Sequence, residues 1–336
     1  MEKISVFRSI LILIVVAVGI GFWVVFEKSL NSAETLEKVT IAEANQMIGS
    51  LVYVASVKGY FEKEGLEVIL QKYTTGKASL NAVLQGRADL ATTAETPIMH
   101  AVMSKQKIYT LATIGTTTKN LALIGRKDHG IKGIHDLRGK KIGITLGTNG
   151  EFFLDTFLLN HLIAKNEIVA VSLKPEEMFD AVMKGEVDAV TTWNPHLRKI
   201  KYELGEKGIL FGDESIYNWT WNIVGMQEFV KNNPETIKKV IRALAAAEEL
   251  IRKDPKEAMR ATAKYFKNNS PDLAEEWELL DLSLSLGQYF LTGIEAQARW
   301  AIKNKLTDQS SVPSFLDYIY ADALKDVKPQ AVTLIQ

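Results

Sequence analysis

The sequence predicts an α/β protein with two lobes, each a mainly parallel βαβαβ sheet with flanking helices, followed by a helical C-terminal region. From Val39 onward, short β-rich runs alternate with helical patterns, as in parallel sheets with crossover helices. One stretch also occurs twice, because residues 83–93 match residues 182–192 at a Val, a Gly, an Asp and a final pair of Thr. Each copy predicts the end of a helix with Gly at its C-terminus, then a short strand that ends in hydroxyl side chains.

The segments before the two copies also correspond to one another. We expect a strand, a helix and a second strand in each unit, at 39–44, 50–63 and 66–71, and again at 141–146, 150–164 and 168–173. The chain is therefore interpreted as two copies of one βαβαβ unit. Because parallel sheets bind ligands at the carboxyl ends of their strands, the predicted site lies in the cleft between the lobes.

Two strand-like segments, 120–126 and 219–225, are expected to cross between the lobes and form a hinge. After Met226 the sequence is helical in pattern to the end, with helix starts at Asn233, Asp254 and Ser270, each followed by Pro. We expect these helices to pack on the first lobe. The predicted division is a signal peptide or membrane anchor at 1–33, lobe 1 at 34–120 and 226–336, and lobe 2 at 121–225.

The N-terminal segment is apolar enough to enter a membrane. Residues 9–26 contain no charged side chain, and Lys3 and Arg8 precede them. As a helix this run would be about 27 Å long, which fits either an uncleaved anchor or a long signal peptide cleaved near Ala33. By the positive-inside rule both alternatives place the rest of the chain in the periplasm or on the extracytoplasmic face of the membrane.

Charge and composition exclude several classes of function. The 336 residues contain 40 Lys and Arg against 40 Asp and Glu, so we expect no nucleic-acid partner. There is no Cys, which excludes disulfides, thiolate metal sites, a Cys nucleophile and a lipid-modified N-terminal Cys. The five His show no metal-ligand spacing, and we predict neither a cofactor nor a catalytic residue.

Three motifs in order resemble one known family: residues 58–68 (KGYFEKEGLEV), 80–89 (LNAVLQGRAD) and 136–143 (DLRGKKIG). They resemble periplasmic substrate-binding proteins of ABC importers, in the branch for nitrate, taurine, aliphatic sulfonates and thiamine precursors. The likeness covers about residues 39–210. It implies a periplasmic-binding-protein fold (type II, Venus flytrap) that closes on a small polar ligand, acts as a monomer, and delivers the ligand to a membrane permease driven by a cytoplasmic ATPase.

The best candidate for ligand binding is the loop Gly147, Thr148 and Asn149, which lies between a predicted strand and helix. Free backbone N–H groups and the helix dipole favour an anion there. The alternative is that Thr148 or Asn149 serves only as the helix cap. Glu95 either caps a helix or accepts a hydrogen bond from a ligand amine or ring N–H. If both groups face the ligand, a zwitterion or a neutral heterocycle fits better than a bare inorganic anion.

Other polar and aromatic residues follow the predicted strands. Lys77 either contacts an anionic group or is simply solvated, and Trp193 is the favoured aromatic wall of the cleft, with core packing as the alternative. The complete set of candidate ligand-binding residues is Gln46, Ser50, Gly76, Lys77, Thr93, Glu95, Thr96, Thr116, Gly147, Thr148, Asn149, Trp193, Asn194, Trp219 and Asn222.

Three functions remain open at this point. The leading one is an import receptor that binds a small molecule and hands it to a permease. A ligand-sensing ectodomain acting through a partner protein is the second, and an enzyme on the same scaffold is the third. The resemblance implies Cys-dependent chemistry for the enzymatic relatives, and this chain has no Cys.

Overall fold

The computed structural model describes residues 36–212, 217–268 and 271–335. The predicted membrane segment at 1–33 lies outside these residues. From Lys38 onward the chain forms one compact unit. Within the described residues, no helix combines the length and apolar character needed to cross a membrane.

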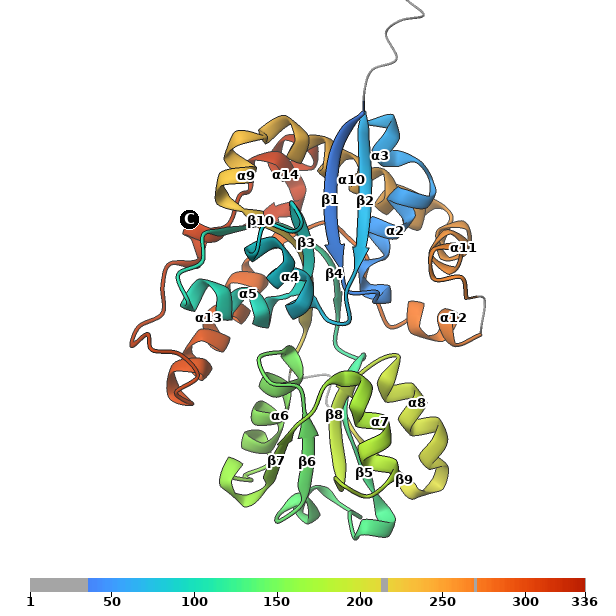
Figure 1. The fold of residues 1–336 in the computed structure, drawn as a ribbon, viewed down its shortest axis with the longest axis vertical. Helices are drawn as coiled ribbons and strands as arrows, with labels where there is room; N and C mark the ends of the chain where they lie inside the picture. Colours follow the sequence, from blue (N-terminus) through green and yellow to red (C-terminus); the bar gives the residue numbers. More distant parts are fainter. Residues whose placement is uncertain (1–35, 213–216, 269–270, 336) are drawn as a thin grey trace, which may run out of the picture. The chain divides into compact units, whose positions relative to one another are not determined.

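The first of two five-stranded sheets in the described residues has the order β2-β1-β3-β10-β4 (Figure 1). Its strands are β1 (Glu37–Glu43), β2 (Leu66–Lys72), β3 (Leu90–Ala94), β4 (Ile108–Thr117) and β10 (Trp219–Met226). β1 is parallel to β3, whereas β10 is antiparallel to both β3 and β4. This sheet and the helices that cover it are called the first lobe below.

The second sheet has the order β7-β6-β8-β5-β9. Its strands are β5 (Leu121–Arg126), β6 (Lys141–Ile144), β7 (Val169–Ser172), β8 (Ala189–Trp193) and β9 (Gly208–Phe211). β6 is parallel to β7 and β8, and β5 is antiparallel to β8 and β9. This sheet and its helices are the second lobe. In Figure 1 the arrowheads of β1 and β2 point toward the second lobe and that of β6 points toward the first.

Helices cover both faces of each sheet because successive strand residues point to opposite faces. In β1, Ile41 packs into one apolar cluster and Ala42 into another. The helices of the first unit are α2 (Ser50–Val57), α3 (Tyr60–Lys63), α4 (Gly76–Leu84) and α5 (Glu95–Met103). Those of the second lobe are α6 (Asn149–Asn160), α7 (Pro175–Met183) and α8 (His196–Leu204). The α/β fold class predicted from the sequence is thereby confirmed.

The repeated motif has one structural role in both lobes. Asp89 lies just before β3, and its carboxylate accepts a hydrogen bond from the backbone N–H of Thr40 in β1 at 2.7 Å. Asp188 lies just before β8 and accepts from the N–H of Lys141 in β6 at 2.8 Å. The shared Asp therefore joins the segment before β3 or β8 to the parallel neighbouring strand, β1 or β6, in both lobes.

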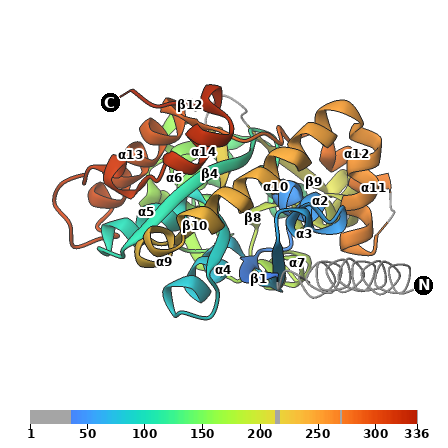
Figure 2. The ribbon, with the colours of Figure 1, turned by 90° about the horizontal axis from the view of Figure 1, so that it is seen from above.

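The region after β10 packs on the first lobe. Its helices are α9 (Gln227–Asn232), α10 (Pro234–Lys253), α11 (Pro255–Phe266), α12 (Pro271–Trp277), α13 (Gln288–Lys303) and α14 (Asp322–Val327). α10 lies beside α2, α11 and α14, and α13 lies beside α5 (Figure 2). The predicted starts of α10, α11 and α12 at a Pro are confirmed. The region is not helical throughout, because β11 (Leu286–Gly287) and β12 (Val332–Thr333) form a short parallel pair.

Two further expectations need correction. The helix predicted at 50–63 is divided into α2 and α3, because Gly59 adopts a left-handed conformation with φ of +66°. The segment 219–225, assigned to lobe 2 and expected to be a crossing, lies inside the first sheet as β10. The chain therefore passes to the second lobe between β4 and β5, and returns between β9 and β10.

Candidate functional site

The strand ends of the first lobe gather around the indole of Trp221 in β10. A Cβ atom on Gly76, the first residue of α4, would lie 2.8 Å from Cη2 of this ring and 2.9 Å from Oγ1 of Thr93. A Cβ atom on Gly49 would lie 3.4 Å from its Nε1. The segments after β1 and β2 therefore meet at one side chain, beside the end of β3, where Ala94 pairs with Trp221. Trp221 is not among the candidate residues selected from the sequence.

The strand ends of the second lobe gather in the same way around Gly150. A Cβ atom there would lie 3.4 Å from both Thr148 Oγ1 and the ring of Trp193. Thr148 caps α6, since its Oγ1 accepts from the N–H of Gly150 and donates to the carbonyl of Thr145 at 2.7 Å. The N–H of Gly147 donates to Glu151 at 2.7 Å, so this donor is already bound within the protein.

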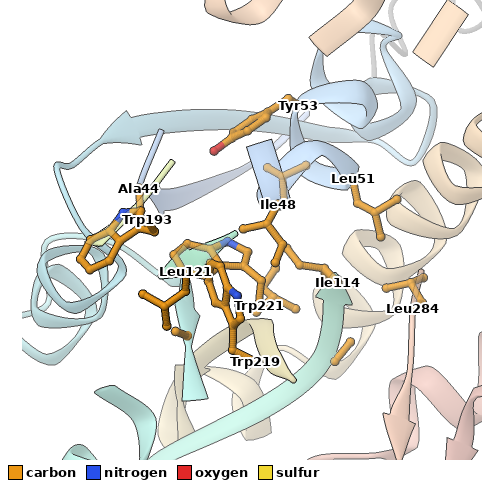
Figure 3. Packing of buried hydrophobic residues seen from close by; sticks show 14 of the residues in the cluster. Ala44, Ile48, Leu51, Tyr53, Ile114, Leu121, Trp193, Trp219, Trp221 and Leu284 are labelled. Atoms are coloured by element: carbon orange, nitrogen blue, oxygen red, sulfur yellow. The ribbon is translucent and has the colours of Figure 1, made fainter. Parts of the chain in front are cut away.

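The aromatic residues of the two lobes belong to one apolar cluster. Figure 3 shows Trp193 beside Ala44, the residue that follows β1, and Trp221 beside Trp219. The rings of Trp219 and Trp221 meet edge to face with centroids 6.0 Å apart. All three indoles are at most 3% exposed, and the Nε1–H of each has no hydrogen-bond partner.

Several candidate polar atoms are also buried and unpaired. They are Oε1 of Gln46, Oγ1 of Thr96 and Nδ2 of Asn149. Buried polar groups in folded proteins are nearly always hydrogen-bonded, and a set of unpaired ones requires an explanation such as an absent partner. These atoms lie at strand ends or helix starts of both lobes, as the sequence analysis expected for a ligand site.

The carboxylate of Glu95 is bound inside the first lobe. Its Oε2 accepts from the N–H and hydroxyl of Thr220 at 2.8 and 2.9 Å, and its Oε1 accepts from Nε2 of Gln297 in α13 at 2.9 Å. Burial raises the pKa of Glu95 from 4.5 to about 7, although its backbone and side-chain hydrogen bonds lower it in part. A ligand amine that binds Glu95, as predicted from the sequence, would therefore have to compete with three donors from within the protein.

Other candidates likewise have partners in the protein. Nζ of Lys77 donates to the carbonyl of Leu146 at 3.0 Å, which joins the two lobes. Asn222 accepts from Thr113 and donates to Thr220, and the hydroxyl of Ser50 donates to the carbonyl of Met47.

Two more candidates are held through their backbone. The N–H of Thr116 donates to the carbonyl of Asp281 at 2.8 Å. The N–H of Asn194 lies 3.2 Å from Oδ1 of Asn120, which follows β4. These bonds fix the main chain of both residues close to the passage between the lobes.

A cavity of about 570 Å³ opens beside the strand ends. It is lined from the first lobe by Gln46 and Met47, which follow β1, and from the second by Pro195 at the start of α8. Arg198 of α8 and Glu276 of α12 also line it, with Arg198 Nη2 and Glu276 Oε2 3.4 Å apart. Burial raises the pKa of Glu276 to about 7. No local pattern in the sequence predicts this pair, because its members are far apart in the chain and belong to no motif.

Histidine and carboxylate side chains form no group of three that would hold a metal ion in the described part of the chain. His100 is the most strongly perturbed His, because burial, together with the charge of Lys77, lowers its pKa to about 4.

The model of one protein family, described as NMT1/THI5 like, matches residues 48–258. The chain belongs to this family. A Brucella abortus (strain 2308) protein named only as a binding protein is 26% identical over 233 residues, which are 68% of this chain and 70% of the relative. The 4-amino-5-hydroxymethyl-2-methylpyrimidine phosphate synthase of Schizosaccharomyces pombe is 22% identical over 246 residues, 67% of this chain and 68% of that protein.

Among solved structures, the alkanesulfonate-binding protein of Xanthomonas axonopodis pv. citri, bound to MOPS, matches with a TM-score of 0.73 at 15% identity. The match covers 86% of this chain and all of that one. This likeness shows the periplasmic-binding-protein fold. The family resemblance and the two-lobed fold expected from the sequence are thereby confirmed.

Proposed function

We propose that this protein is an extracytoplasmic solute-binding receptor of an ABC importer, which closes its two lobes on a small polar ligand and delivers it to a permease. The family, the fold and the binding role named for relatives support this proposal. The apolar segment 9–26 with Lys3 and Arg8 before it supports the location. For the lobes we propose the predicted boundaries, except that the return to the first lobe precedes β10.

The observation that carries the proposal is the set of three unpaired indole N–H groups, of Trp193, Trp219 and Trp221. Leaving one buried donor without a partner costs about 1–3 kcal/mol, so the three together cost roughly 3–9 kcal/mol. A ligand that accepts their hydrogen bonds would recover this free energy, which corresponds to dissociation constants from about millimolar to about micromolar. Because Trp193 belongs to the second lobe and the other two to the first, such a ligand would favour the closed form.

These donors favour a ligand that is rich in acceptors. Sulfonate and nitrate oxygens and the ring nitrogens of a pyrimidine all accept hydrogen bonds from N–H groups. The Nδ2 of Asn149 adds a fourth donor from the second lobe. The proposed class is therefore a sulfonate or taurine, a nitrate-like anion or a pyrimidine-like compound.

The test is a thermal-shift and calorimetric screen of the full-length chain in detergent against taurine, methanesulfonate, nitrate and a 4-aminopyrimidine. A ligand at a hundred times its dissociation constant should stabilise the protein by about 2.7 kcal/mol. Trp193→Phe keeps the ring and removes the N–H, and should weaken binding of the hit about tenfold. Trp277→Phe changes an indole outside the unpaired set and should leave affinity unchanged. A hit that Trp193→Phe and Trp277→Phe bind equally well would refute the role of the indole donors.

The proposal assigns no catalytic residue. The fission-yeast relative is named as a synthase, so the same screen should include analysis of the candidate compounds after prolonged incubation with the protein. Recovery of each compound unchanged is the expected result, and formation of a new product would overturn the receptor proposal.

A further inference from the structure

The helix that begins at the Gly147 loop of the second lobe also contacts the C-terminal region of the first lobe. In α6, Asp155 Oδ2 accepts a hydrogen bond from the indole Nε1 of Trp300 in α13 at 2.9 Å. Phe152, three residues earlier in α6, meets the ring of Trp300 edge to face, with centroids 5.3 Å apart. Trp300 therefore contacts the second lobe through both a polar and an aromatic interaction.

A second aromatic ring from outside α6 reinforces this contact. The rings of Phe152 and Tyr217 are also edge to face, at 5.1 Å. The hydroxyl of Tyr217 accepts from Nε2 of Gln297, which lies one turn before Trp300 in α13. Phe152 is thus held by two rings that are both connected to α13.

The acceptor of the Trp300 bond is a charged group. The side chain of Asp155 is 7% exposed, and Nζ of Lys165 lies 2.7 Å from the same oxygen that accepts from Trp300. Hydrogen bonds to charged acceptors are about twice as strong as those between neutral groups. A contact of this type is absent when the lobes separate, because its two partners lie on different lobes.

The contact shares a rigid element with the candidate ligand loop. Glu151, one turn before Asp155 in α6, accepts from the N–H of Gly147 at 2.7 Å, and Thr148 caps the same helix. A ligand that fixes the Gly147 loop therefore also fixes the helix that presents Phe152 and Asp155 to Trp300.

We propose that Trp300, together with Phe152 and Asp155, forms an interlobe clasp that stabilises the closed form and so increases ligand affinity without belonging to the strand-end site. In this arrangement Trp300 is a positioning residue. The inference rests on the proposed function, since it assumes that the lobes open and close around a ligand. Its effect on affinity follows from linkage, because a ligand that binds the closed form gains what the clasp contributes to closure.

The test measures the opening equilibrium without ligand. The chain has no Cys, so Lys184→Cys in the second lobe and Lys253→Cys in the first, both largely exposed, accept a pair of dyes in the full-length protein. Single-molecule energy transfer then gives the ratio of closed to open molecules. Trp300→Phe keeps the aromatic contact and removes the N–H, and should lower this ratio about tenfold.

The partner variant and the control make the test specific. Asp155→Ala removes the acceptor, so it should lower the same ratio in the parent chain but add little in the Trp300→Phe chain, because the same bond is lost in both. Trp277→Phe should leave the ratio unchanged. An unaltered ratio in Trp300→Phe, or independent effects of Trp300→Phe and Asp155→Ala, would overturn the clasp. If Trp300→Phe lacks the circular-dichroism spectrum of the folded chain, Asp155→Ala alone decides.

Failure of the clasp and failure of the receptor proposal have different signatures. Taurine, methanesulfonate and nitrate are added to the same labelled chains. A parent chain that none of them closes or stabilises counts against the receptor proposal, whereas the ligand-free comparison judges the clasp. If one probe does bind, Trp300→Phe should weaken its binding by the factor by which it lowers the closed fraction, and unchanged affinity despite a lowered closed fraction would refute the linkage.

Discussion

Replacement of Glu95 by Gln should stabilise the protein at alkaline pH. Burial raises the pKa of Glu95 from 4.5 to about 7, so the folded state resists ionisation that the unfolded chain undergoes freely. A raised carboxyl pKa gives stability that is fully present below pH 4.5 and is lost as the pH rises toward 7 and above. From these two values the loss of unfolding free energy between pH 5 and pH 8 is about 2–3 kcal/mol. Glu95→Gln cannot ionise and should not show this loss.

The groups around Glu95 can form hydrogen bonds with the Glu95→Gln side chain as well. The amide oxygen of Gln at position 95 can replace Oε2 as the acceptor for Thr220. The NH₂ group of the new side chain then faces the amide of Gln297. The Oε1 of Gln297 has no partner, and a flip of this amide would let Oε1 accept a hydrogen bond from that NH₂ group. Gln297 can then also accept from the hydroxyl of Tyr217, so each hydrogen bond has a replacement.

The assay is urea denaturation of the parent chain and Glu95→Gln at pH 5 and pH 8. The difference in unfolding free energy between the two proteins should change by about 2–3 kcal/mol in favour of the variant between pH 5 and pH 8. His100 and Glu276 also titrate, but they are present in both proteins and cancel in the difference. Parallel pH dependence of the two proteins would show that Glu95 is not the buried acid we describe.

Three other substitutions test the elements that form the site. Gly76→Ala should cost about 1–3 kcal/mol of unfolding free energy, because its methyl group would collide with Trp221. The control Gly293→Ala, in open space on α13, should be neutral or stabilising, and equal effects of the two substitutions would argue against the close contact. Asp89→Ala should cost about 1–3 kcal/mol through the lost bond to Thr40, against less than about 0.5 kcal/mol for the exposed Asp180→Ala, and similar costs would contradict the role of the repeated Asp. Thr148→Ala should cost about 1 kcal/mol of unfolding free energy, measured by urea denaturation, and Thr148→Ser much less, because Ser keeps the hydroxyl that caps α6. Equal costs for the two variants would contradict this capping role.

Local signals in the sequence predicted much of the scaffold. The Gly and Asp of the repeated motif lie at the same structural positions in both lobes, with φ of +68° at Gly86 and +74° at Gly185. Glycine favours such left-handed positions because it has no Cβ. In both lobes the Asp bonds a backbone N–H of the neighbouring parallel strand, β1 or β6. The starts of α10, α11 and α12 were predictable for a similar reason, since Pro lacks the N–H that a first helical residue does not need.

The candidate site was predictable in position but not in its interactions. The sequence placed polar residues at strand ends, because alternation of strands and helices determines where those ends occur. Which of these residues keep unpaired atoms depends on neighbours from distant segments. Glu95 is bound by Thr220 and Gln297, far along the chain, and so its internal partners have no local signature.

The sequence by itself determined the family, the duplicated unit and the two-lobed α/β architecture, because turns, caps and strand periodicity act over a few residues. Only the tertiary structure decided that β10 lies between β3 and β4, that three buried indoles keep their N–H groups unpaired, and that Trp300 reaches Asp155 in the other lobe. Those features depend on packing between segments that are far apart in the chain, where no spacing rule connects one residue with its partner.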